Sequence, residues 1–213
     1  MSGNPSLVIA IDGPAASGKS TVAKRLASEL GIVFVSSGGM YRAFTWWVLE
    51  NGVDPARTGD VEALLEKTEF QCGEQDNIGT IAVNGQLLSR EQLANEAVNG
   101  GVSLVAAIPS VRSRLVDEQR AYAKERGVVM EGRDIGSVVF PDTSNKFYID
   151  ASPEVREQRR RAEGIDDSIA ARDRMDSNRK ASPLVIPEDA TVVDSSDLSI
   201  EEVVEKVKKS LVS

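Results

Sequence analysis

The sequence contains no histidine and a single cysteine, Cys72, among its 213 residues. The lack of histidine excludes Ser-His-Asp and Cys-His catalysis, together with metal sites built on imidazole ligands. One cysteine excludes an intramolecular disulfide and any zinc site that needs several thiolates. These absences remove several common classes of hydrolase and metalloenzyme from consideration.

Long hydrophobic runs and an excess of positive charge are also missing. The longest apolar runs, residues 7–11 and 102–109, are far shorter than the ~20 residues that cross a bilayer. The first residues show no basic stretch followed by an apolar core, as a secretory signal would. The formal net charge of −8 argues against a nucleic-acid surface, because phosphate backbones require a basic face. We therefore expect a cytoplasmic protein with neither a membrane nor a nucleic-acid partner.

Five short apolar segments, separated by helical patterns, indicate an α/β protein. They are residues 7–11, 32–35, 128–130, 146–149 and 191–193. Such runs without alternation of polar residues are typical of buried parallel strands. The length of the chain suits one α/β domain with an inserted subdomain. The sequence therefore predicts a doubly wound, five-stranded parallel sheet.

Helical spacing fills most of the intervals between these segments. A helix is predicted over residues 19–30, where Gly31 supplies the stop signal, and another over 40–50. Residues 102–126 are also helical in pattern, and Pro109 can stand in the first turn of a new helix. An arginine-rich helical stretch covers 153–179. The last helix begins after Ser199, which opens a capping box.

The segment from residue 51 to residue 101 interrupts the α/β alternation. It is acidic, and it contains Asn84-Gly85, a strong signal for a β-hairpin turn. We interpret 51–101 as a small strand-containing subdomain, inserted into a core made of 1–50 and 102–213. For Trp46 and Trp47, which precede it, packing is a better interpretation than base stacking.

A glycine-rich loop follows the first predicted strand. Gly13-Pro14-Ala15-Ala16-Ser17-Gly18-Lys19-Ser20 matches G-x-x-x-x-G-K-[ST] at every fixed position, between a strand and a helix as the motif requires. Glycines let the backbone wrap around phosphates with its N–H groups pointing inward, and the helix N-terminus adds a positive dipole end. Lys19 supplies a cation for the β- and γ-phosphates, and the Ser20 hydroxyl is placed to bind Mg²⁺.

Several residues near this loop keep two interpretations. Ser17 and Thr21 either contact phosphates or serve as cap and packing residues. Asp12 either holds a magnesium-bound water or stabilises the turn. A GTPase is not favoured, because Asn145-Lys146 lacks the aspartate that completes Asn-Lys-x-Asp. The D-x-x-G pattern at Asp76 is short enough to arise by chance.

Arginines are concentrated at two places where they could bind a second phosphate. Arg42 follows the second predicted strand, and Arg133-Asp134 follows the third. The carboxyl ends of parallel strands share one edge of the sheet, where doubly wound folds bind ligands. Arg42, Arg133 and Asp134 should therefore face the phosphate loop across a crevice. Arginine forks suit phosphate oxygens, and a further group of arginines crowds into residues 156–179.

The whole chain resembles the bacterial cytidylate kinases. The resemblance rests on the loop 11–20 and on motifs further along the chain: Ser37-Gly38 with Tyr41-Arg42, residues 105–109 with Val111-Arg112, Glu131-Gly132-Arg133-Asp134-Ile135-Gly136, residues 139–142 and 146–148, Arg172-Asp173 with Asp176 and Asn178-Arg179, and Ser182-Pro183-Leu184. Two segments depart from the family pattern. The stretch between Arg161 and Arg172 is short, and residues 90–95 lack the usual basic pattern.

The resemblance implies transfer of the γ-phosphoryl group of ATP to CMP or dCMP, and it implies roles for particular residues. The cytosine-binding set is Ser37, Ser103, Arg112 and Asp134. Phosphate binders are Arg42, Arg133 and Arg179, with Tyr41 also on the substrate side, and sugar contacts are Arg172 and Asp176. Residues 156–176 form a short lid, in which Arg156 and Arg160 bind ATP together with 13–21. Lys19, Arg133 and Arg159 are the catalytic set, and Ser20 is the metal ligand.

Such a transfer requires no general base. The attacking phosphate oxygen of CMP has a second pKa near ~6 and is largely ionised at neutral pH, which suits a chain without histidine. We expect a monomer that uses ATP and Mg²⁺. Two alternatives remain from the sequence: a kinase for another nucleoside monophosphate, and a nucleotide-binding regulator without catalysis.

Overall fold

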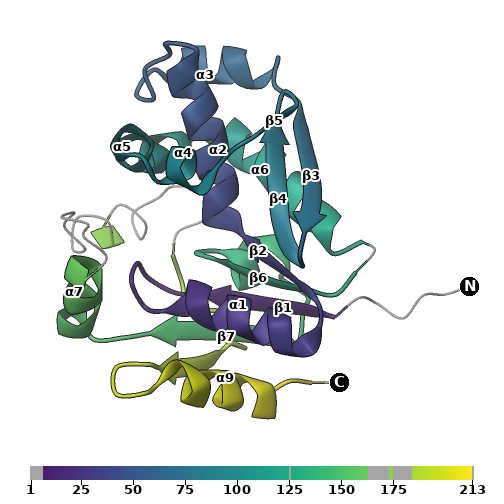
Figure 1. The fold of residues 1–213 in the computed structure, drawn as a ribbon, viewed down its shortest axis with the longest axis vertical. Coiled ribbons are helices and arrows are strands. Elements are labelled where there is room, and N and C mark those ends of the chain that lie inside the picture. The colour runs from purple at the N-terminus through teal and green to yellow at the C-terminus, as the bar shows by residue number, and fades with distance from the viewer. Residues whose placement is uncertain (1–6, 125, 163–172, 175–183, 213) are drawn as a thin grey trace, which may run out of the picture.

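The computed structural model describes residues 7–124, 126–162, 173–174 and 184–212, and its centre is a parallel sheet (Figure 1). The five parallel strands lie in the order β2 (Val33–Ser36), β6 (Val128–Gly132), β1 (Val8–Asp12), β7 (Asn145–Asp150) and β8 (Thr191–Asp194). All five predicted strands are present, and the parallel α/β fold class is confirmed. Strand β1 lies at the centre, between β6 and β7.

Helices cover both faces of this sheet. On one face, α1 (Lys19–Leu30) and α9 (Ile200–Lys209) pack against a cluster that contains Ile9, Ile11 and Val129. On the other face, α2 (Ser37–Glu50) and α6 (Pro109–Tyr122) belong to a larger cluster with Ala10 and Met130. Successive residues of β1 and β6 thus point to opposite layers, as the pleat of a strand requires. The central strands β1 and β6 are therefore buried on both sides.

The segment predicted as an insertion extends the sheet at its β2 edge. The hairpin of β3 (Phe70–Gln75) and β4 (Ile78–Val83) joins β2 through the pair Phe34–Ile78, and β5 (Gln86–Leu87) pairs with β4. The predicted hairpin turn is confirmed, since Asn84 and Gly85 join β4 to β5 with φ angles of 48° and 78°. The D-x-x-G pattern at Asp76 is a tight turn followed by the first residues of β4.

Two helices of this segment and the first part of a third were not predicted. They are α3 (Thr58–Leu65), α4 (Arg90–Ala94) and α5 (Glu96–Val105). Helices α4 and α5 lie beside α2, and α3 packs against α6 (Figure 1). Short helices with little apolar periodicity depend on tertiary packing for their stability, which a sequence pattern does not show. Because α5 continues past residue 101, the insertion and the core share a helix.

Other boundaries also differ from the prediction. Helix α2 begins at Ser37 instead of residue 40, because Gly38 and Gly39 read as a turn in the sequence but are helical in the fold. A break at residues 106–108 separates α5 from α6, and Pro109 opens α6 as expected. Helix α7 (Pro153–Ala162) opens the predicted helix 153–179, of which residues 173–174 are also described and helical. The capping box at Ser199 is confirmed.

Two smaller expectations concern packing and membranes. Trp46 is buried in the larger core cluster, and Trp47 packs against that cluster, as the packing interpretation predicts. Among the residues that the structure describes, no helix is long and apolar enough to cross a membrane.

The loop after β6 is held by the carboxylate of Asp12. Its two oxygens accept hydrogen bonds from the backbone N–H groups of Ile135 (2.8 Å) and Gly136 (2.7 Å), at the start of a π-helical turn, η1 (Ile135–Val139). Burial raises the pKa of the Asp12 carboxyl from 3.8 to about 6, although the two N–H donors favour its charged form. Of the two interpretations of Asp12, these hydrogen bonds fit the one in which its carboxylate stabilises the turn.

We predict that Gly13→Ala destabilises the fold. Gly13 has a φ of 154°, and a Cβ at this position would lie 2.1 Å from the carbonyl oxygen of Ile149 in β7. The clash should lower the free energy of unfolding by about 3 kcal/mol, as overpacking does. Gly100→Ala is the control, because no atom lies within 4 Å of its added Cβ and alanine favours helix α5. Urea denaturation with equal midpoints for both variants would contradict the prediction.

We also predict that Asp12 titrates near pH 6 in the folded protein, which ¹³C NMR of its carboxyl carbon can follow. Because the folded state binds this proton more tightly than the unfolded state, the stabilisation is full below pH 3.8 and is lost as the pH rises through about 6. Relative to Asp12→Asn, the wild type should gain on the order of 3 kcal/mol of unfolding free energy between pH 7 and pH 4. A carboxyl midpoint at or below pH 4 would refute this.

Candidate active site

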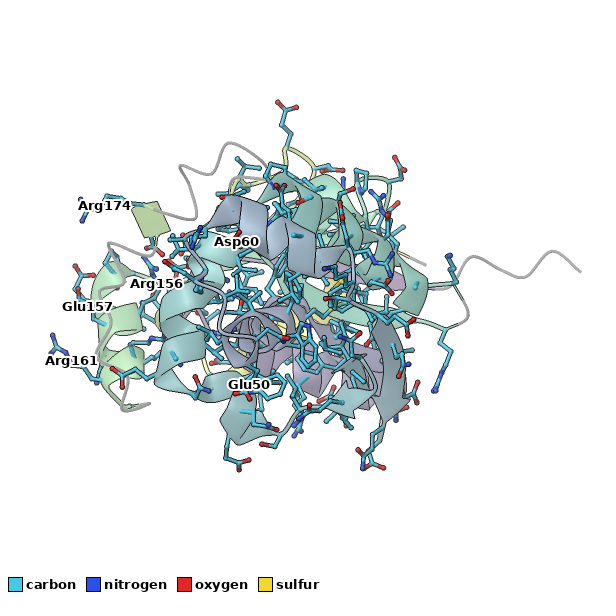
Figure 2. The ribbon with its side chains drawn as sticks, turned by 90° about the horizontal axis from the view of Figure 1, so that it is seen from above. Glu50, Asp60, Arg156, Glu157, Arg161 and Arg174 are labelled. Atoms are coloured by element: carbon cyan, nitrogen blue, oxygen red, sulfur yellow. The ribbon has the colours of Figure 1, made fainter. Side chains whose placement is uncertain are left out.

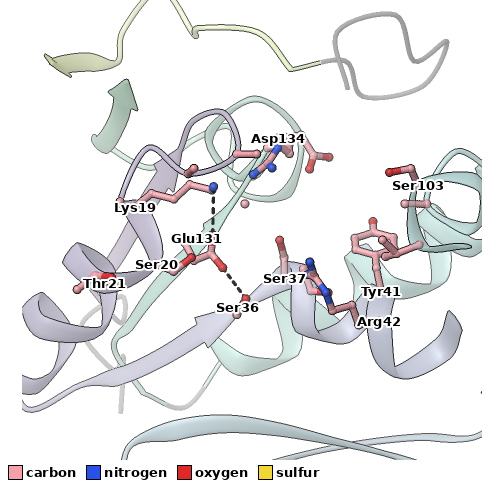
Figure 3. A pocket seen from close by; sticks show the side chains of 18 of the residues that line it. Lys19, Ser20, Thr21, Ser36, Ser37, Tyr41, Arg42, Ser103, Glu131 and Asp134 are labelled. Atoms are coloured by element: carbon pink, nitrogen blue, oxygen red, sulfur yellow. Dashed lines mark hydrogen bonds and ion pairs between the residues drawn. The ribbon is translucent and has the colours of Figure 1, made fainter. Parts of the chain in front are cut away.

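The carboxyl ends of β1, β2 and β6 meet at one edge of the sheet, and a pocket of about 740 Å³ opens there (Figure 3). The pocket brings together most of the predicted site residues. The phosphate-loop side contributes Ala15, Ala16, Gly18, Lys19, Ser20 and Thr21; the opposite side contributes Ser37, Tyr41, Arg42, Ser103, Arg112, Arg133 and Asp134; and Arg160 comes from α7. The sequence therefore identified residues on both sides of this pocket.

The phosphate loop connects β1 to α1 with a tightly turned backbone. Gly18 adopts a φ of 86°, and Ala16 adopts a φ of 59°, which is uncommon for a residue with a side chain. Lys19 Nζ donates a hydrogen bond to the carbonyl oxygen of Pro14 (2.9 Å), so the lysine folds back over its own loop. Ser20 and Thr21 are exposed on the pocket. Ser17 is fully buried and does not line it.

Glu131 is a site residue that sequence reasoning missed. It is the penultimate residue of β6, lies opposite Ser36 of β2, is 5% exposed, and accepts a hydrogen bond from Ser36 Oγ (2.5 Å). Its other oxygen lies 3.9 Å from Lys19 Nζ. The available signal was its place in the motif 131–136, directly after an apolar run, where a buried carboxylate requires a partner. Glu131 thus supplies a nearby negative charge for the Lys19 ammonium group, which is hydrogen-bonded to Pro14.

The donor set at this end of the pocket suits a magnesium ion that also binds phosphate oxygens. Ser20 offers a hydroxyl oxygen and Glu131 a carboxylate, and both line the pocket (Figure 3). Among the described residues, no group of three or more aspartate, glutamate, cysteine or histidine side chains could hold a metal ion. A cation here would therefore need the nucleotide phosphates as further ligands.

A buried ion pair forms the far end of the pocket. Arg112 and Asp134 are each 4% exposed, and Arg112 Nη2 pairs with Asp134 Oδ2. Arg112 is also held by the carbonyl oxygen of Ala106 (3.2 Å) and lies over the Tyr41 ring, 5.3 Å from its centroid. Because the guanidinium and the carboxylate fix each other, this end presents a rigid polar surface.

Residues from three elements surround this ion pair. Ser37 and Arg42 come from the first turns of α2, and Ser103 comes from α5. The close approach of α2 depends on Gly132, where a Cβ would lie 2.5 Å from Ser37 Oγ. Arg90, at the start of α4, also lines the pocket. The sequence did not indicate Arg90, because residues 90–95 depart from the family's basic pattern.

The arginines of α7 divide into two groups. Arg160 lines the pocket, whereas Arg156 and Arg159 donate to carbonyl oxygens on the outside of the phosphate loop. Arg161 projects away from the molecule (Figure 2). Of the other predicted site residues, Gly13 and Pro14 are buried and do not line the pocket, and Arg172, Asp176 and Arg179 lie outside the described residues.

Comparison with known proteins identifies the family. The family model for cytidylate kinase matches residues 9–212. The cytidylate kinase of Geobacillus kaustophilus is 43% identical over 210 residues, which cover 93% of each chain. That of Streptomyces avermitilis is 40% identical over 212 residues, which cover 95% of this chain and 91% of the relative.

Two further relatives define the extent of the similarity. A bifunctional pantoate ligase/cytidylate kinase of a Synechococcus species is 42% identical over 214 residues, and the match spans 94% of this chain but 44% of that protein. The crystal structure of an uncharacterized protein from Eubacterium ventriosum is 16% identical, with a TM-score of 0.51 over 95% of this chain and 96% of that chain, and shows the fold alone. The resemblance seen in the motifs is confirmed: the chain belongs to the cytidylate kinase family.

Proposed function

We propose that this protein transfers the γ-phosphoryl group of ATP to CMP or dCMP, giving ADP and CDP or dCDP. The observation that carries the proposal is a single pocket with two ends. A phosphate loop with Lys19 forms one end, and the buried Arg112–Asp134 pair forms the other. A triphosphate and a nucleoside monophosphate can therefore approach each other within one pocket.

The far end of the pocket has the groups needed to recognise cytosine. Asp134 can accept a hydrogen bond from the exocyclic amine, and the hydroxyls of Ser37 and Ser103 can pair with the edge of the ring. Uracil carries a carbonyl oxygen where cytosine has the amine, so the same carboxylate would repel it. The rigidity of the Arg112–Asp134 pair strengthens this discrimination because neither group can turn away.

The transfer itself depends on positioning and on charge. Arg42 and Arg133, between the two ends, can hold the acceptor phosphate, while Lys19 and Arg160 approach the phosphates of ATP. The acceptor oxygen is already ionised, so no side chain has to remove a proton. Ser20 and, through water, Glu131 would hold Mg²⁺, which supplies further neutralisation of the β- and γ-phosphate oxygens when bound.

The remaining expectations stay proposals. Residues 51–101 would bind the monophosphate as an inserted subdomain, and 156–176 would close over ATP as a lid. Arg172, Asp176 and Arg179 would contact the sugar and the phosphate of the acceptor. The protein would act as a monomer in the cytoplasm.

We predict that turnover with ATP is fastest for CMP or dCMP and at least about tenfold slower for UMP and AMP, since the cytosine amine has a dedicated acceptor. A coupled assay for ADP, at saturating concentrations of each monophosphate, measures this. Equal or faster turnover of UMP or AMP would make the chain a kinase for another monophosphate. Binding of ATP without binding of any monophosphate would instead support a nucleotide-binding regulator.

We further predict that Asp134→Asn weakens CMP much more than ATP. Loss of a charged hydrogen bond should raise the KM for CMP about 10- to 100-fold, while the KM for ATP changes less than about threefold. Asparagine keeps an oxygen for Arg112, so this variant should fold better than Asp134→Ala, which leaves a buried charge unpaired. Thermal unfolding verifies that the variant is folded. An unchanged KM for CMP in a folded variant would refute the cytosine site.

A further inference from the structure

The outer side of the phosphate loop carries contacts that the proposed reaction does not use. We infer that Arg159 and Ser195 are positioning residues, which set the loop for ATP by holding the carbonyl oxygen of Ser17 from outside the pocket. The resemblance assigns Arg159 to the reacting phosphoryl group, so this is a different role. The inference rests on the proposed function only in taking ATP as the ligand of the loop.

Three hydrogen-bonding groups meet at this point. Ser195 Oγ donates to the Ser17 carbonyl oxygen (2.9 Å), and Arg159 Nη1 donates to the same oxygen (3.2 Å). The arginine also binds Ser195 directly, through Nη1 to Oγ (3.1 Å) and Nη2 to the carbonyl oxygen (2.8 Å). Ser17 is fully buried and Ser195 is 3% exposed. The hydrogen bond from Ser195 to Ser17 is therefore buried, and those of Arg159 are partly buried. A hydrogen bond is electrostatically stronger in the protein interior than in water.

The geometry of the peptide bond links the contact at the Ser17 carbonyl to the direction of the Gly18 N–H group. In a trans peptide the C=O of one residue and the N–H of the next point in opposite directions. A carbonyl of Ser17 that is drawn outward thus turns the N–H of Gly18 toward the pocket that Gly18 lines. Inward N–H groups are what a phosphate loop offers to a nucleotide. Arg159 and Ser195 accordingly orient one backbone N–H group, that of Gly18, which can donate a hydrogen bond to a phosphate.

A second arginine makes the same kind of contact one step earlier in the loop. Arg156 Nη1 donates to the carbonyl oxygen of Ala15 (3.4 Å), which sets the peptide that carries the N–H of Ala16. Arg156 is itself held by Asp173 (2.7 Å) and by the carbonyl oxygen of Ala151 (3.1 Å). Because Ala16 has a φ of 59°, the loop includes an unfavourable backbone conformation that outside contacts can maintain.

The hold on Ser17 is anchored in the sheet through Ser195, and Arg159, near the start of the proposed lid segment 156–176, is bound to that anchor. Ser195 directly follows β8, and its N–H donates to the carbonyl oxygen of Asp150 at the end of β7 (2.8 Å). Arg159 does not line the pocket, although its neighbour Arg160 does. A lid arginine aimed at the reacting phosphoryl group would have to leave Ser17 and Ser195 first. The contacts therefore favour a fixed position for Arg159.

The test compares Ser195→Ala, Arg159→Ala and the double variant, with Arg161→Ala as the matched control. Arg161 lies on the same helix, and its side chain is 81% exposed. Isothermal titration with ATP and with inorganic tripolyphosphate measures binding, and the coupled assay gives kcat. We expect Ser195→Ala to raise the Kd of both ligands about tenfold, the effect of one buried hydrogen bond, while kcat at saturation falls less than threefold.

Further readouts separate positioning from general loss of structure. The effects of the two substitutions should not multiply, because both residues hold one carbonyl oxygen. The double variant should therefore bind ATP less than about tenfold more weakly than Arg159→Ala. Ser195→Thr should restore affinity, since it keeps the hydroxyl. The ¹⁵N–H resonance of Gly18 should move in Ser195→Ala but not in Arg161→Ala.

Two results would overturn the inference. One is a Ser195→Ala variant with unchanged affinity and an unchanged Gly18 resonance, and this variant decides the question even if Arg159→Ala does not fold. The other is an Arg159→Ala variant whose kcat falls about a thousandfold at unchanged tripolyphosphate affinity, as for an arginine that contacts the transferring group. Failure of the wild type to phosphorylate CMP would refute the proposed function instead, and the tripolyphosphate titrations would still decide the inference.

Discussion

The parallel pairing of β1 with β6 is the constraint on which the rest of the site depends. It places Asp12 beside Gly132, so the phosphate loop and the loop that carries Arg133 and Asp134 begin at the same edge of the sheet. The Asp12 carboxylate then joins the two loops by accepting hydrogen bonds from η1. Two segments that are far apart in the sequence thereby form one pocket: Asp12 and Ile135, which the first of these bonds joins, are 123 residues apart.

Charge is distributed to match this arrangement. The chain is acidic overall, with a formal net charge of −8, yet arginines and Lys19 gather where two phosphate-bearing molecules would meet. Two carboxylates inside the pocket, Glu131 and Asp134, each pair with a cation. The lack of histidine is consistent with a transfer whose nucleophile arrives ionised. Catalysis by such a site consists mainly of holding charges at fixed places.

Much of the fold could be predicted from local patterns, and most of the residues that line the pocket were named from the motifs or from the family resemblance. The five parallel strands, the phosphate loop and the turn at Asn84-Gly85 each depend on a few adjacent residues, and all are confirmed. The helices of residues 51–101 escaped prediction because much of their stability comes from packing, of α4 and α5 against α2 and of α3 against α6. Glu131 and Arg90 were missed for a related reason, since a charged residue reveals its function only through its partners.

The sequence by itself determined the family, the order of strands along the chain and the residues that can bind phosphate, because those properties follow from local composition and from the spacing of a motif. Only the tertiary structure decided which of these residues face the pocket. Arg159 and Arg160 are neighbours of the same type, and one binds the outside of the phosphate loop while the other lines the pocket. Their separation depends on the position of α7 against β8 and the loop, which arises from packing between segments far apart in the chain.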